Sequence, residues 1–282
     1  MDARASDSNT LRGEFYLCLA RAFQTPVAPE LFVALQHDLA DELDDLAGHI
    51  GYAAADAIDD YQQQIAMVPS ADRLLQAYSR LFLQPPRAVQ LNTGVYLDGG
   101  LNGGSVMEMD EWYAACGLAR ADGFRDLSDH VSVQLEFVAY LFQHALVEGG
   151  PDAVMPRSAP QFIGRFVARW LPGWMADLEE AARELALDAT PYLALARILA
   201  IAVAADAEQY GLLPPAQARR EKALAGARRK QADKGITSAD MEEIRRRLAE
   251  SGLATDHLDQ PYESRDAQHG WQRMTPPAPR KR

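Results

Sequence analysis

The chain has 282 residues, of which 48% are hydrophobic and 24% are charged. These fractions are typical of a folded globular protein and exclude a largely disordered chain. Only two cysteines occur, Cys18 and Cys116, so neither a disulfide framework nor a cysteine-rich metal site is available. We therefore expect the protein to work in a reducing compartment.

Charge is distributed unevenly along the chain. Residues 1–213 contain 13 arginines, no lysine and 30 acidic residues, which is a formal charge of −17. Residues 214–282 contain 15 basic and 10 acidic residues, which is a formal charge of +5. The acidic first part is expected to repel nucleic acid and to attract cationic partners.

Two segments bear on localisation. The polar start of the chain, MDARASDSNTLRGEFY, has no apolar run and predicts no secretory signal. The most apolar run, Pro191 to Ala205, is too short to span a bilayer and contains Arg197. We interpret this run as a core helix and expect a cytoplasmic protein without stable membrane insertion.

Apolar residues recur at helical spacing in nearly every segment, and no alternating pattern predicts a strand. Pro29 and Pro191 occupy first-turn positions that tolerate proline, and Ser70 is a suitable N-cap. The pattern predicts an all-α domain of about eight helices over residues 1–213. In chain order, helices are expected over residues 10–24, 29–50, 71–83, 106–118, 128–147, 160–187 (interrupted at Pro172) and 191–205, with a Gly- and Asn-rich loop at 91–105.

The composition changes after Pro214-Pro215. Residues 216–233 are rich in Ala, Arg and Lys, and residues 239–252 have a weak apolar stripe at helical spacing. The Pro-rich, basic end is typical of disorder. The sequence therefore predicts a domain boundary near residue 213 and a basic, partly helical or disordered extension over 214–282.

The segment 124–142 (FRDLSDHVSVQLEFVAYLF) groups polar residues most clearly. Ser128 is a suitable N-cap, which places Asp129 in a first helical turn, where the helix dipole favours a carboxylate. The pattern fits two interpretations: an ordinary amphipathic helix with a solvent-exposed polar face, or a helix that forms a binding surface. Two adjacent stripes carry Asp129, Val133, Glu136 and Tyr140, and then His130, Gln134, Phe137 and His144, while Val131, Leu135, Val138 and Phe142 face the core.

The sequence contains no recognised catalytic or metal-binding motif. The position four residues after His130 is Gln134 rather than a second histidine, and His37-Asp38 lacks the further ligands of a phosphohydrolase. The glycine-rich stretch 99–104 has no Walker lysine, and no GxSxG occurs. The sequence therefore predicts neither a bound metal nor a cofactor.

Aromatic pairs at helical spacing are typical of core packing. Tyr78 and Phe82 lie four positions apart and share one helix face. Trp170 and Trp174 flank Pro172 and indicate packing at a helix kink.

Three landmarks follow one another along the chain: Tyr78-x-x-Leu81-Phe82, then Pro85, Tyr96, Gly99, Tyr113, Gly117 and Leu118, and then Asp126, Asp129, His130, Leu135, Glu136 and Phe137. Together they resemble the TorD/DmsD/NarJ family of cytoplasmic chaperones for complex iron–sulfur molybdoenzymes. The resemblance extends over residues 8–213, and the third landmark is the most specific. The chain departs from the family pattern at Leu127, where the family usually has proline, and at Thr93-Gly94, where it lacks the serine that the family has before the loop tyrosine.

This resemblance implies a non-enzymatic, all-helical chaperone. Its partner would be the apo catalytic subunit of a dimethyl sulfoxide reductase superfamily molybdoenzyme. The chaperone would bind the twin-arginine signal peptide or the N-terminal region of that subunit, assist cofactor insertion and prevent premature export.

A twin-arginine leader has two guanidinium groups followed by an apolar stretch, so its receptor needs carboxylates beside an apolar surface. The predicted client-binding residues are the carboxylates Asp126, Asp129 and Glu136, the aromatic residues Tyr78, Phe82, Tyr96 and Phe137, and the hydrogen-bonding residues His130 and Gln134.

Two other interpretations stay open. A helical enzyme that uses no metal would need Asp129, His130 and Glu136 on one face for acid–base chemistry. A regulatory or nucleic-acid-binding module would act through the basic tail, although the charge of −17 on the rest of the chain disfavours nucleic acid.

Overall fold

We describe the protein from a computed structural model of the full chain. The structure describes residues 3–84, 88–118, 127–144 and 158–212, and their side chains from Asp7 onward. The chain separates into two compact units, Met1–Arg229 and Lys230–Arg282, and every described residue belongs to the first. The predicted boundary near residue 213 and the predicted extension over 214–282 lie outside the described residues.

Within these ranges the chain is helical and contains no β-strand, which confirms the predicted all-α fold. Two segments, η1 and η2, are π-helices that continue directly from a neighbouring α-helix. In chain order the elements are α1 (Ala3–Ala22), α2 (Pro29–His37), α3 (Leu39–Ile50), α4 (Ala55–Ala66), α5 (Ala71–Tyr78), η1 (Ser79–Leu83), α6 (Gly94–Asp98), α7 (Gly104–Ala115), α8 (Val131–His144), α9 (Ala159–Phe162), η2 (Ile163–Val167), α10 (Ala168–Glu184) and α11 (Pro191–Gln209).

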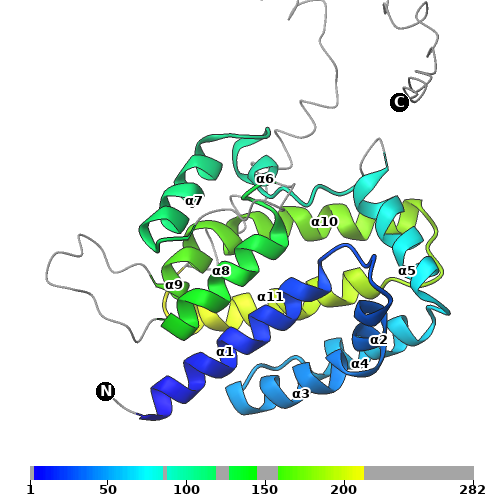
Figure 1. Ribbon diagram of the computed structural model, residues 1–282, viewed down its shortest axis with the longest axis horizontal. Coiled ribbons are helices and arrows are strands. Elements are labelled where there is room, and N and C mark those ends of the chain that lie inside the picture. Colours follow the sequence, from blue (N-terminus) through cyan, green and yellow to red (C-terminus); the bar gives the residue numbers. More distant parts are fainter. Residues whose placement is uncertain (1–2, 85–87, 119–126, 145–157, 213–282) are drawn as a thin grey trace, which may run out of the picture. The chain divides into compact units, whose positions relative to one another are not determined.

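Helix α11 occupies the middle of the described fold, packed against both α4 and α10 (Figure 1). It contains the apolar run predicted as a core helix, and Pro191 stands in its first turn as expected. No helix among the described residues has the length and apolarity needed to cross a bilayer.

Helices α1 and α8 pack closely against each other (Figure 1). The small size of Gly13 permits this approach, because a Cβ there would lie 2.8 Å from Gln143 Cγ and 3.1 Å from the carbonyl oxygen of Ala139. The pair places one face of α8 in the core and leaves the other face toward solvent.

A buried ion pair joins α1 to α11. Arg12 Nε lies 3.0 Å from Asp206 Oδ1, and the hydroxyls of Tyr16 and Tyr52 donate to the same carboxylate at 2.8–3.0 Å. Burial raises the pKa of Asp206, although the hydrogen bonds from Tyr16, Arg12 and Tyr52 act in the opposite direction. The sequence carries no local signal for this cluster, because Arg12 and Asp206 lie 194 positions apart.

The structure differs from the prediction in two places before residue 67. The single helix expected over 29–50 is divided at Asp38 into α2 and α3. Its apolar positions continue at helical spacing from Leu35 to Leu39, so the pattern contains no signal for the break. Helix α4, which supplies the buried residues Ile58, Tyr61 and Ile65, was not among the expected helices.

The helix expected to be interrupted at Pro172 instead continues through it, since α10 runs from Ala168 to Glu184. The irregular turn is η2, which ends directly before Ala168. A proline at position 172 lacks an N–H for the carbonyl of residue 168 and crowds that carbonyl. The wide π-turn therefore lies next to the place where the proline disturbs the helix.

Candidate functional site

The nine predicted client-binding residues differ in accessibility. Tyr96 is half-buried, Glu136 is exposed, and Asp126 lies outside the described residues. The other six are buried, with exposed fractions of 0–7%: Tyr78, Phe82, Asp129, His130, Gln134 and Phe137.

Asp129 anchors the start of α6 to the turn before α8. Its Oδ2 accepts the backbone N–H of Gly94 at 2.8 Å, and its Oδ1 accepts the amide of Asn92 at 3.2 Å. Its backbone carbonyl accepts the N–H of Thr93 at 3.1 Å. The carboxylate therefore holds together two segments of the chain in the conformation described.

The expected N-cap at Ser128 is wrong, because α8 begins at Val131. Residues before the helix pair with the chain that precedes α6: Asn92 and His130 form an antiparallel bridge, and the Val131 N–H donates to the Leu91 carbonyl at 2.9 Å. This pairing holds Asp129 and His130 outside the helix. The segment 91–105, which was expected to be a loop, therefore contains the bridge at Asn92. It also contains the short helix α6.

Gln134 connects three elements inside the protein. Its Nε2 donates to the Thr93 hydroxyl and, at 2.8 Å, to the Asp129 carbonyl. Its Oε1 accepts the indole N–H of Trp170 at 2.9 Å. His130 Nδ1 accepts the N–H of Ser132 at 3.2 Å, which places the proton of a neutral ring on Nε2.

The catalytic face required by the enzyme interpretation is not assembled in the described conformation. Asp129 is fully buried, whereas Glu136 is exposed and its Oε1 accepts the amide of Gln24 at 3.1 Å. No group of three or more His, Cys, Asp or Glu that could hold a metal ion is found in the part of the chain that the structure describes.

The aromatic landmark Tyr78–Phe82 lies in the core. The two rings are 4.9 Å apart, and Tyr192 of α11 packs against both at 5.4 and 5.5 Å. The Tyr78 hydroxyl donates to the Phe23 carbonyl at 3.2 Å. The π-helix η1 begins at the next residue, Ser79, so this landmark spans the junction between α5 and η1.

Tyr96 and Glu136, the two described client-binding candidates that are not buried, belong to different helices. Tyr96 of α6 donates its hydroxyl proton to Asp177 of α10 at 3.0 Å. Glu136 lies on the outward side of α8, while the neighbouring Phe137 packs inward against Tyr113 and Phe162 at 4.7 and 4.9 Å. The predicted residues that the structure describes, which exclude Asp126, therefore do not form one continuous surface.

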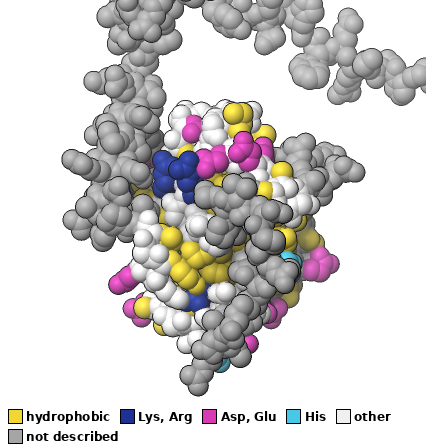
Figure 2. Space-filling model, turned by 90° about the vertical axis from the view of Figure 1, so that its left-hand side faces the viewer, with side chains coloured by type: hydrophobic (Ala, Val, Ile, Leu, Met, Phe, Trp, Pro, Cys, Tyr) yellow, Lys and Arg dark blue, Asp and Glu magenta, His cyan; other side chains and the backbone are white. Residues whose placement is uncertain are grey.

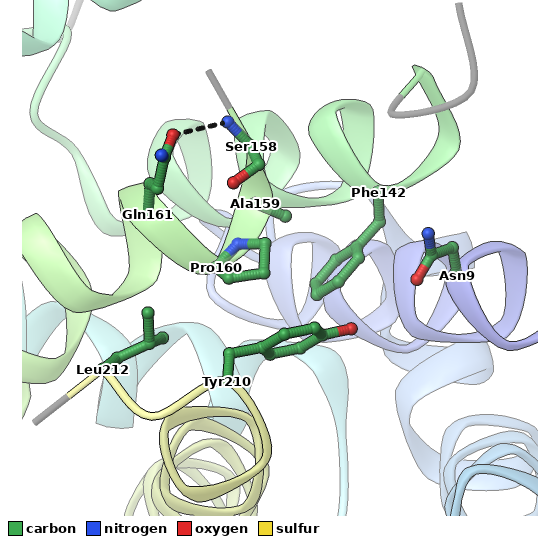
Figure 3. A pocket seen from close by; sticks show the side chains of 8 residues that line it. All are labelled: Asn9, Phe142, Ser158, Ala159, Pro160, Gln161, Tyr210 and Leu212. Atoms are coloured by element: carbon green, nitrogen blue, oxygen red, sulfur yellow. Dashed lines mark hydrogen bonds between the residues drawn. The ribbon is translucent and has the colours of Figure 1, made fainter. Parts of the chain in front are cut away.

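A pocket of ≈ 410 Å³ opens where α1, α8, α9 and the end of α11 meet (Figure 3). Sequence reasoning missed it, because its walls come from four separate elements. None of its lining residues is charged, and most are apolar. They are Asn9, Phe142, Ser158, Ala159, Pro160, Gln161, Tyr210 and Leu212.

The nitrate reductase delta subunit family model matches residues 36–176, which is half of the chain. The chain belongs to this family. The nitrate reductase delta subunit family comprises NarJ/TorD-like chaperones for redox enzyme maturation, so the resemblance inferred from the landmarks is confirmed. The matched range includes Tyr78 and the segment from Asp129 to Phe137, but not α11.

A solved protein of Archaeoglobus fulgidus, described as a candidate redox enzyme maturation protein, is 19% identical with a TM-score of 0.38, over 67% of this chain and 91% of that one. No curated protein matches the chain.

Proposed function

We propose that this protein is a cytoplasmic chaperone for a molybdoenzyme of the dimethyl sulfoxide reductase superfamily. It binds the twin-arginine signal peptide or N-terminal region of the apo catalytic subunit, assists cofactor insertion and prevents premature export. Membership of a family of redox enzyme maturation chaperones carries the proposal, because it implies a redox enzyme subunit as the partner.

The charge of the chain supports a cationic client segment. Residues 1–213 have 30 acidic residues against 13 arginines and no lysine. Several of the acidic side chains are exposed on neighbouring helices, including Asp41, Asp44 and Asp45 of α3 and Asp56 and Asp59 of α4. The negative electrostatic field of these side chains increases the rate at which a doubly cationic leader associates with the protein. Dissolved salt screens this field over about 8–10 Å at physiological ionic strength.

The exposed carboxylate of Glu136 is the direct contact that we propose for a leader arginine, together with Asp126. Tyr96 is half-buried and offers part of its ring to an apolar neighbour. The six buried predicted residues contact other parts of the protein, so a direct role in binding requires those parts to move. Residues 92–94 would have to leave Asp129, His130 and Gln134. Tyr192 would have to leave Tyr78 and Phe82, and Tyr113 and Phe162 would have to leave Phe137. Without that movement, these six residues support the binding surface from inside.

The test is binding of a labelled peptide with two adjacent arginines followed by a run of leucine and alanine. We expect binding that weakens as the salt concentration rises, and no binding of the same peptide with glutamines in place of the arginines. Glu136→Gln should weaken binding about threefold, as expected for an exposed ion pair, and Glu180→Gln, an exposed carboxylate of α10, should not.

A second readout addresses maturation. The catalytic subunit produced together with the chaperone should contain more molybdenum cofactor than the subunit produced alone. The proposal fails if the wild-type protein binds neither the leader peptide nor the apo subunit at low salt.

A further inference from the structure

The carboxylate of Glu136 is held by a residue that lies outside its own helix. Its Oε1 accepts the side-chain amide of Gln24 at 3.1 Å, and both residues are exposed. The two lie 112 positions apart, so the contact depends on the packing of α1 against α8. Among the residues that the structure describes, no arginine pairs with Glu136, and its Oε2 accepts no hydrogen bond.

Gln24 stands on a turn that the core holds in place. It follows α1, and the buried ring of the preceding Phe23 packs edge-on against Trp174 of α10 at 5.3 Å. The Phe23 carbonyl accepts the Tyr78 hydroxyl at 3.2 Å, and the backbone N–H of Gln24 donates to the Arg21 carbonyl at 3.1 Å. A side chain on a fixed backbone can hold its partner in one place.

These contacts connect two of the landmarks found in the sequence. Tyr78 of the first landmark is buried, and its hydroxyl holds the residue before Gln24. Glu136 of the third landmark is exposed, and its carboxylate is held by Gln24. Gln24 belongs to neither landmark, but it links the buried aromatic residue of the first to the exposed carboxylate of the third.

The chemical type of the residue that holds Glu136 matters for a cationic ligand. An amide N–H donates to a carboxylate without neutralising its charge, whereas a lysine or arginine would form an ion pair and compete with the ligand. Charge alone does not mark a binding position on this protein. Figure 2 shows acidic side chains at several separate places on one face of the molecule. A carboxylate held in one position costs a guanidinium less ordering when it binds.

We propose that Gln24 positions the Glu136 carboxylate for an arginine of the client's leader. This inference rests on the proposed function and adds a residue that determines how well the site accepts a cation. Gln24 holds Oε1 and leaves Oε2, together with the negative charge, for the guanidinium. Gln24 is a positioning residue, because it acts on the ligand through Glu136.

Two substitutions test the two parts of this role. Gln24→Met keeps the size and neutrality of the side chain but removes the donor, and Gln24→Lys adds a cation that competes for Glu136. The probe is the labelled peptide with two adjacent arginines, used with the full chain at low salt. We expect about threefold weaker binding for Gln24→Met and about fivefold weaker binding for Gln24→Lys, which is the range of an exposed ion pair.

Gln62 supplies the matched controls. It is an exposed glutamine of α4, which packs mainly against α11 and α3. Gln62→Met and Gln62→Lys therefore make the same changes of chemistry and charge on a different helix. We expect unchanged binding for Gln62→Met and less than about twofold weaker binding for Gln62→Lys, through the general field of the protein. If the Gln24 variants bind the peptide as tightly as the corresponding Gln62 variants, the inference is wrong.

A double-mutant cycle shows whether Gln24 acts through Glu136. In a Glu136→Gln background, Gln24→Met should cause no further loss of binding, and Gln24→Lys should cause no more loss than Gln62→Lys. A residue that only supports the fold would give losses that add to that of Glu136→Gln. Additive losses therefore overturn the inference.

The outcomes separate the inference from the proposed function. If the wild-type protein binds no leader peptide, the proposed function fails and the inference fails with it. If the wild type binds the peptide and Glu136→Gln weakens binding, but the Gln24 variants match their controls, only the inference fails. If Glu136→Gln binds as tightly as the wild type, the inference fails while leader binding itself stands.

Discussion

The Oδ2 atom of Asp129 accepts the backbone N–H of Gly94 at 2.8 Å, although the two residues lie 35 positions apart. This bond places the start of α6 against the turn before α8. The most specific of the three sequence landmarks therefore has a structural role in the described conformation. It joins two segments, and Glu136 is the one that is exposed among the members of this landmark that the structure describes.

Gly94→Ala should destabilise the protein by about 1–3 kcal/mol, the usual cost of overpacking. A Cβ at this position would lie 2.7 Å from both Asp129 Oδ2 and Val106 Cγ2, which is closer than either contact permits. Urea unfolding measures the change. Gly48→Ala is the control, because nothing lies within 4 Å of its Cβ on α3, and it should be neutral or stabilising by up to about 1 kcal/mol. Equal urea midpoints for Gly94→Ala and wild type would contradict the predicted clash.

Asp129→Ala should cost about 1–3 kcal/mol of folding stability, because the buried N–H of Gly94 and the amide of Asn92 lose their acceptor. Glu136→Ala should leave the stability within about 0.5 kcal/mol of the wild type, as expected for an exposed residue. Thermal and urea unfolding of both variants test this contrast. If both variants unfold at the same urea concentration as the wild type, the assignment of a structural role to Asp129 is wrong.

Asp206→Asn should destabilise the protein by about 1–3 kcal/mol at pH 3.8, because the amide puts a donor in place of one of the oxygens that accept hydrogen bonds from Arg12, Tyr16 and Tyr52. The pKa of Asp206 is raised above 3.8 in the folded state, so the folded state holds this proton more tightly than the unfolded state. The stability that the folded state gains by holding this proton is fully present below pH 3.8. It is lost as the pH rises through the raised pKa of Asp206. The gap in unfolding free energy between wild type and Asp206→Asn should therefore narrow as the pH rises from 3.8.

Urea unfolding at a series of pH values measures this gap, with the exposed Asp41→Asn as the control for general effects of charge. A gap that widens with rising pH would show that the ion pair outweighs desolvation at Asp206.

Cys116 should react with a thiol reagent much faster than Cys18 in the folded protein. Burial raises the pKa of the Cys18 thiol to about 12, and Glu42 acts in the same direction. At pH 8 its reactive thiolate is then on the order of one part in ten thousand, whereas Cys116 is only partly buried. Titration with Ellman's reagent should reveal one thiol before unfolding and two after it. Cys116→Ser should abolish the fast phase, and a fast phase that persists would contradict the assignment.

The helical fold and the family could be recognised from the sequence because their signals are local. The spacing of apolar residues predicted the core helix α11, and the third landmark led to the family that the comparison confirmed. The same landmark did not predict the burial of Asp129. Helical spacing placed it in a first turn, and the true partner, Gly94, lies in a glycine-rich segment without periodicity.

The amino-acid sequence alone determined the class of fold, the acidic character of residues 1–213 and the family, since each depends on composition, periodicity or a short motif. Tertiary structure decided which polar residues are inside. Contacts such as Arg12 with Asp206 and Asp129 with Gly94 join residues whose distance along the chain carries no local signal. The pocket beside Phe142 belongs to the same class, because four elements must meet before an uncharged space exists between them.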